Sequence, residues 1–82
     1  MSSKPHQVIQ RFPDQEPVIR RLFETSPNFN TLCHAYNEVT EALHRLQASA
    51  EPSAESEIER LRKRRANLDD QMLAMMQQTA RV

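Results

Sequence analysis

The 82-residue sequence has no glycine, no tryptophan and a single cysteine. The lack of glycine excludes P-loop nucleotide binding, because Walker-type loops and dinucleotide-binding turns need glycine backbone close to phosphate. The lone cysteine, Cys33, excludes a disulfide within the chain. His34 adjoins it but points elsewhere on a helix, and His6 and His44 are not at ligand spacing, so we expect no metal and no cofactor.

Long apolar runs are also missing. The stretch MSSKPHQVIQ lacks the apolar core of a signal peptide, and no run approaches the roughly 20 residues that cross a bilayer. We therefore expect a cytoplasmic protein with a reduced thiol and no membrane partner.

Good helix formers dominate the composition. Ala, Leu, Glu, Gln, Arg and Met are common, whereas the aromatics are three Phe and one Tyr, which predicts an all-α fold. A chain of this length makes one small domain, 1–82, that buries too little surface to be stable without help. Since neither a disulfide nor a metal supplies that help, we expect a homo-oligomer.

Five prolines, at positions 5, 13, 17, 27 and 52, divide the chain into four segments. Residues 6–25 comprise an N-terminal arm and a short helix over about 14–25. A hairpin helix is predicted over 27–48, with Ser26 as its cap, and a second over 54–78. The start signals of the second are Ser53 and a capping box of Ser56 and Glu59.

The two long helices carry apolar residues at alternating intervals of three and four, as in a coiled-coil seam. Folding the chain back at Pro52 matches both sets in one register, from Leu46 opposite Ile58 to Phe29 opposite Met75. The sequence therefore predicts an antiparallel, coiled-coil-like helical hairpin. The seam positions are Phe29, Leu32, Tyr36, Val39, Leu43 and Leu46 on one helix and Ile58, Leu61, Arg65, Leu68, Met72 and Met75 on the other.

The apolar face of the last helix is wider than a two-helix seam, because Leu73 and Met76 lie beside it. The short first helix, a second copy of the protein, or both must cover this face. Leu73 and Met76 are the preferred interface residues. Tyr36 is expected to pack within the seam, and Phe12 either docks the arm or is presented to a partner.

Arg65 occupies a seam position opposite Val39. Because an unpaired buried charge is costly, we expect its stem to pack and its guanidinium to reach Glu38, Glu41 or Asp69. A polar residue in a seam can fix register and partner choice at some cost in stability. We interpret Arg65 as a specificity residue.

A basic run lies in the last helix, and one hypothesis is that it contacts the phosphates of nucleic acid. The net charge of the chain is zero, successive helical residues point about 100° apart, and acidic residues stand three or four positions from the run. We therefore expect a solvated, ion-paired face, with nucleic-acid binding as the alternative. The possible phosphate contacts are Arg60, Arg62, Lys63, Arg64 and Arg65.

The stretches HQVIQRFPDQEPVIRRLFETSPNFNTLCHAYNEVTEAL and IERLRKRRANLDDQML together resemble the YdcH-like family of small bacterial proteins. The matching features are a His in the arm, a Phe-Pro pair, a Phe opening the next helix, and a basic stretch ending in Leu and Asp. Here they are His6, Phe12, Pro13, Phe29, Leu61, Arg62, Lys63, Arg65, Leu68 and Asp70. The chain departs from the family pattern at Tyr36, Ala66 and Asp69. The resemblance implies a small helical-hairpin protein and implies no particular activity.

Catalytic groups are not evident in this sequence. No carboxylate pair or Cys/His set has a plausible pocket, and two or three helices offer little concave volume for a substrate. We expect a protein without enzymatic activity or a small-molecule substrate. The sequence favours a protein–protein interaction or structural accessory module, whose partner other than a second copy is unknown.

Overall fold

The computed structural model describes residues 5–49 and 51–80, with the backbone alone at residue 80. Its elements in chain order are α1 (His6–Arg11), a 3₁₀ turn η1 (Pro13–Gln15), α2 (Glu16–Thr25), α3 (Pro27–Ser49) and α4 (Ala54–Ala80). The described residues include no strand, so the predicted all-α class is confirmed. None of the helices within those ranges is both long and apolar enough to cross a membrane.

The predicted helix over 14–25 is in fact two elements, and Pro17 explains why. A continuous α-helix would need the residue-17 N–H to bond the carbonyl of Pro13, and proline has no N–H. The Glu16 N–H bonds that carbonyl instead, which closes the 3₁₀ turn before α2 begins.

The predicted start signal is correct for α3 and only partly correct for α4. Ser26 caps α3, because its Oγ accepts a hydrogen bond of 3.2 Å from the backbone N–H of Phe29. Helix α4 begins directly after Ser53, and the Ala54 N–H donates to the Glu51 carbonyl at 3.0 Å. The capping box was a wrong prediction, since Ser56 and Glu59 both lie inside α4.

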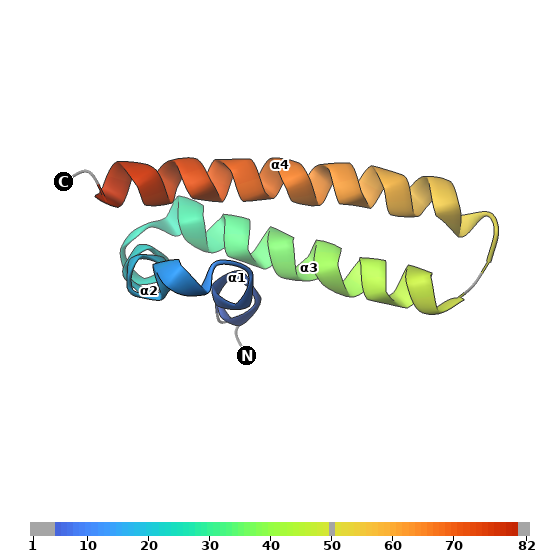
Figure 1. Ribbon diagram of the computed structural model, residues 1–82, viewed down its shortest axis with the longest axis horizontal. Helices are drawn as coiled ribbons and strands as arrows, with labels where there is room; N and C mark the ends of the chain where they lie inside the picture. Colours follow the sequence, from blue (N-terminus) through green and yellow to red (C-terminus); the bar gives the residue numbers. More distant parts are fainter. Residues whose placement is uncertain (1–4, 50, 81–82) are drawn as a thin grey trace.

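Helices α3 and α4 lie side by side and run in opposite directions (Figure 1). They make the molecule elongated, with extents of 47 × 25 × 21 Å. Helices α1 and α2 pack on one side of this pair, over the half that lies away from the 49–54 connection (Figure 1). The loop-side half of α3 and α4 therefore extends beyond the N-terminal helices.

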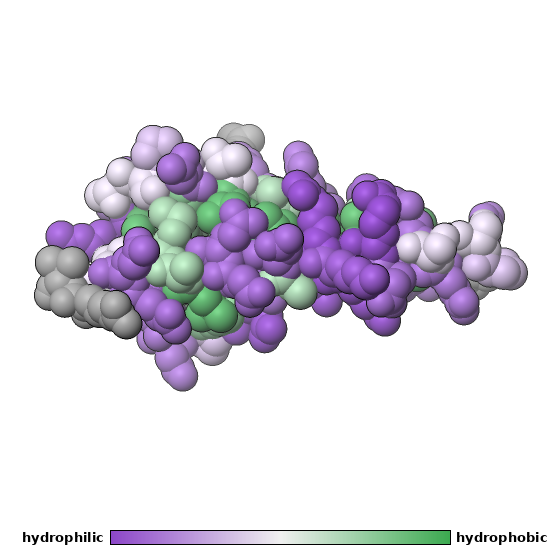
Figure 2. Space-filling model, turned by 90° about the horizontal axis from the view of Figure 1, so that it is seen from above, coloured by the Kyte–Doolittle hydropathy of each residue, from purple (hydrophilic) through white to green (hydrophobic). Residues whose placement is uncertain are grey.

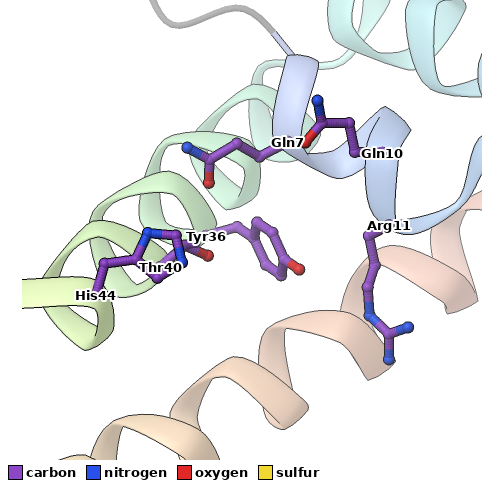
Figure 3. Close-up of a pocket in the computed structure, with 6 residues that line it drawn as sticks. All are labelled: Gln7, Gln10, Arg11, Tyr36, Thr40 and His44. Carbon is purple, nitrogen blue, oxygen red and sulfur yellow. The ribbon is translucent and has the colours of Figure 1, made fainter. Parts of the chain in front are cut away.

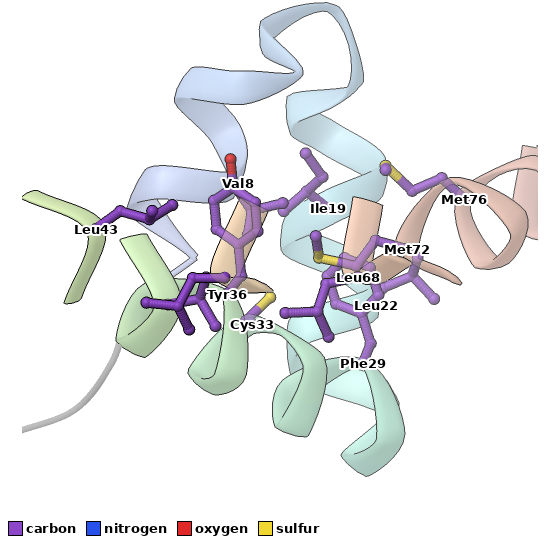
Figure 4. Packing of buried hydrophobic residues seen from close by; sticks show 12 residues of the cluster. Val8, Ile19, Leu22, Phe29, Cys33, Tyr36, Leu43, Leu68, Met72 and Met76 are labelled. Atoms are coloured by element: carbon purple, nitrogen blue, oxygen red, sulfur yellow. The ribbon is translucent and has the colours of Figure 1, made fainter. Parts of the chain in front are cut away.

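One apolar cluster joins all four α-helices (Figure 4). Val8 from α1 and Ile19 from α2 are fully buried in it, at 0% exposure. The N-terminal helices therefore cover the wide apolar face within a single chain. The other buried members are Leu22, Phe29, Cys33, Tyr36, Val39, Leu43, Leu61, Leu68, Met72 and Met76.

Because α1 and α2 pack on one side of the α3–α4 pair, the buried core lies on that side and does not follow the whole predicted seam. Leu32 and Met75, on the side away from them, are only partly buried, and so are Leu46 and Ile58 toward the loop. Met76 was expected at an interface with a partner, but its side chain is 1% exposed and lies beside α2 (Figure 4). The structure corrects that prediction, because α2 already occupies the place expected for a partner.

The docking of α2 gives a first prediction. Replacing the fully buried Ile19 with Ala should lower the free energy of unfolding by about 2–5 kcal/mol, because it leaves a cavity in the core. Leu46→Ala, at a partly buried position, should cost clearly less. Urea denaturation followed by circular dichroism at 222 nm measures both, and equal losses would contradict this arrangement of the core.

Candidate functional site

The principal polar site of the described chain lies where α1, α3 and α4 meet. A pocket of about 440 Å³ there is lined by Arg11 of α1, Tyr36 of α3 and a group from α4. The α4 residues are Arg62, Arg65, Ala66 and Asp69. Three guanidinium groups and one carboxylate thus border the same pocket, which leaves an excess of two positive charges.

An ion pair between α1 and α4 organises this pocket. The Arg11 Nη2 lies 3.4 Å from the Asp69 Oδ2, and the side chains are 55% and 13% exposed, respectively. The Arg11 guanidinium also lies 5.3 Å from the centroid of the Phe12 ring. Because the arginine is more than half exposed, the pair contributes at most about 1 kcal/mol, and its main effect is to orient both groups.

The partner of Asp69 differs from the prediction. Arg65 is half-buried, as its seam position implied, yet among the described residues it forms no ion pair with Glu38, Glu41 or Asp69. The docking of α1 brings Arg11 to Asp69 and leaves the Arg65 guanidinium at the pocket.

Tyr36 links this pocket to a second one. Burial raises the pKa of its hydroxyl and the charge of Asp69 raises it further, whereas Arg65 and Arg11 lower it. The residue is 5% exposed, and its hydroxyl is directed toward Arg11 (Figure 3). Tyr36 therefore keeps its proton at neutral pH and can act as a hydrogen-bond donor.

The second pocket, of about 340 Å³, continues along α1 and α3 (Figure 3). Besides Arg11 and Tyr36, its lining consists of Gln7, Gln10, Thr40 and His44. The buried Gln7 Oε1 has no hydrogen-bond partner in the described part of the chain, and neither does Asp69 Oδ1. These atoms can bond a ligand or water.

The basic run does not form a single strip. Arg60 is paired with Glu57, which lowers the pKa of that carboxyl. Arg62 and Arg65 face the pocket with Arg11, whereas Lys63 and Arg64 are exposed and outside it.

Of the sequence-predicted site residues, the structure thus brings together Tyr36, Arg62 and Arg65. Phe12 is partly buried against the core, and Leu73 is half-buried on α4. Sequence reasoning did not select Arg11, because only tertiary packing brings α1 to α4.

Cys33 is fully buried in the core. Across residues 5–49 and 51–80, no three His, Cys, Asp or Glu side chains gather as a metal site would require.

The family model and the relatives that match this chain are described as of unknown function or uncharacterized. Residues 29–76 match the family model described as "Protein of unknown function (DUF465)". The chain is 30% identical over 67 residues to the "Uncharacterized protein YdcH" of Escherichia coli (strain K12) and to that of Shigella flexneri, which covers 82% of this chain and 90% of each relative. No solved structure matches. The chain belongs to the DUF465 family, as the resemblance to YdcH-like proteins implied.

Burial of Cys33 gives a second prediction. It raises the pKa of the thiol from 9.0 to about 12, so the folded protein keeps Cys33 protonated at pH 8. Alkylation by iodoacetamide at pH 8 should be slow in buffer and fast in urea. The pKa of this thiol is higher in the folded state than in the unfolded state. The contribution of Cys33 to the free energy of unfolding is therefore complete below pH 9 and is lost as the pH rises toward 12. Equal alkylation rates with and without urea would contradict the burial.

Proposed function

We propose that this protein is a non-enzymatic protein–protein interaction module that associates with a second copy of itself through the outer face of α4. One observation carries the proposal. Apolar residues appear on that face over the half where α1 and α2 pack, whereas the loop-side half is covered by hydrophilic side chains (Figure 2). Exposed apolar surface on a small domain is typical of an interaction site.

We assign two apolar residues of α4 to this patch: Leu73, which is half-buried, and Ala66, which is exposed and also borders the pocket between α1, α3 and α4. They are seven positions apart on α4, so two helical turns bring them to the same side of the helix. We call them the α4 patch.

A second copy can occupy the α4 patch without electrostatic repulsion between the basic runs. A two-fold axis at Leu73 would bring the two Leu73 side chains together in an antiparallel α4–α4 contact. The basic runs, eleven residues from that axis, would then lie at opposite ends, roughly 30 Å apart at 1.5 Å per residue. That separation exceeds the Debye length of about 10 Å, so the like charges would not oppose association.

This arrangement predicts the effect of a charge at the axis. Leu73→Glu places two carboxylates against each other and should weaken self-association at least tenfold in sedimentation equilibrium. The matched control is Ala48→Glu, at an exposed position of α3 outside the patch, which should leave the mass unchanged. An apolar contact should also persist in 0.5 M salt, whereas binding that depends on phosphate contacts would fall by orders of magnitude.

Disulfide trapping provides a readout that does not depend on Leu73→Glu remaining folded. Because Cys33 is buried, Leu73→Cys introduces the one accessible thiol among the described residues. A disulfide needs a distance of about 4.4–6.8 Å between the Cα atoms of its two cysteines. Two residues at position 73 that face each other across a two-fold axis would satisfy this requirement. Mild oxidation should therefore link Leu73→Cys into dimers and leave Ala48→Cys monomeric. A wild-type monomer at all concentrations, or equal cross-linking of both variants, would overturn the proposal.

We also propose that Arg65 fixes the register in which α3 and α4 pair, since it is a half-buried cation at a seam position. Arg65→Leu should raise the melting temperature and broaden the mass distribution in sedimentation, because apolar seams accept more than one register. Arg64→Leu, at an exposed position of the same helix, is the control. An unchanged oligomeric state and helix pairing in Arg65→Leu would reject this role.

A further inference from the structure

We propose that the pocket between α1, α3 and α4 binds inorganic phosphate in its hydrogen-phosphate form. The pocket lies within one chain and is bordered by Arg11, Tyr36, Arg62, Arg65, Ala66 and Asp69, so it shares Ala66 with the α4 patch. Phosphate binding is nevertheless measured separately from self-association. Each property of the pocket corresponds to a property of that ion.

The charge of the pocket matches a dianion. Three guanidinium groups, from Arg11, Arg62 and Arg65, face one carboxylate, Asp69, so the excess of two positive charges equals the charge of hydrogen phosphate. Guanidinium groups bind oxyanions through paired N–H donors, and these come from both sides of the pocket, Arg11 from α1 and the other two from α4. The protonated hydroxyl of Tyr36 adds a neutral donor.

Asp69 distinguishes phosphate from other oxyanions. Its Oδ2 is paired with Arg11, whereas its buried Oδ1 has no hydrogen-bond partner in the described part of the chain. This oxygen is enclosed, so the carboxylate has to turn toward the pocket before it can accept a hydrogen bond from a ligand. A carboxylate oxygen can only accept, so in that orientation it favours a ligand that is an anion and still carries a proton to donate. Hydrogen phosphate has such a P–OH group at neutral pH, and sulfate does not. A sulfate oxygen placed beside Oδ1 would be repelled.

The shape of the site favours a small ion over nucleic acid. The arginines border one pocket of about 440 Å³ instead of following a line along α4. Lys63 and Arg64, which a duplex lying along the basic run would use, are outside the pocket, and Arg60 is paired with Glu57. A polyanion would also bring further phosphates close to the Asp69 carboxylate.

Isothermal titration of the full-length protein with inorganic phosphate, at pH 7.5 in a chloride buffer, tests the assignment. We expect saturable binding of one phosphate per chain. Arg11→Gln and Arg62→Gln should each weaken it at least tenfold, since each removes a charged hydrogen-bond donor. Arg62 is exposed, so its substitution leaves the core intact. Lys63→Gln removes the same charge from the same helix outside the pocket and should change the affinity less than twofold.

Two competing anions test the role of Asp69. Sulfate should bind at least tenfold more weakly than phosphate, and Asp69→Asn, which adds an N–H donor, should remove this preference. Methyl phosphate loses its P–OH above a pKa of about 6, so at pH 7.5 it should also bind more weakly than the free ion. This arm separates free phosphate from a phosphate ester as the ligand. Methyl phosphate or sulfate binding as tightly as phosphate would overturn the assignment.

The remaining outcomes also decide the question. Absence of saturable binding by about 10 mM phosphate would overturn the site. So would equal weakening by Lys63→Gln and Arg11→Gln, because it would mean that phosphate responds to the basic run as a whole. A third outcome would assign the basic run to nucleic acid instead: a short duplex DNA binds more tightly than phosphate, and Lys63→Gln weakens the binding of that DNA as much as Arg11→Gln does.

Discussion

The burial of Val8 against the α3–α4 pair is the contact on which the other features depend. Helix α1 has six residues, and a helix of that length does not form by itself in water. Its side-chain anchor is Val8, which is fully buried in the shared core, and the following turn and α2 continue the cover with Ile19. An 82-residue chain without disulfide or glycine obtains one closed core by folding its own N-terminal helices onto a long helix pair.

That packing also creates the polar site. Once Val8 is buried, Arg11, one turn further along α1, lies beside Asp69 of α4 and the two side chains pair. The same docking encloses Tyr36 and leaves the guanidinium groups of Arg62 and Arg65 facing Arg11 across a pocket. A zero net charge over the whole chain is therefore compatible with a strongly positive site, because position in the fold decides which charges meet.

Local features were predictable from the sequence, and long-range ones were not. The all-α class and the Ser26 cap follow from composition and short-range signals, and the predicted ranges 27–48 and 54–78 differ from α3 and α4 by one or two residues at their ends. The burial of Met76 was missed, because periodicity along α4 cannot tell whether α2 or a partner covers its wide face. Arg11 was missed for the same reason, since its partner is 58 positions away.

Native-state hydrogen exchange of the α1 amides tests the central claim most directly. The amides of Ile9 and Phe12 donate to the carbonyls of Pro5 and Val8, respectively, both at 2.9 Å. If α1 is held by the core, these amides should exchange only through openings that also expose the centre of α3, with protection well above that of an isolated peptide. Exchange of both at the rate of an unstructured chain, while α3 stays protected, would show that α1 is undocked and would contradict the core and the pocket together.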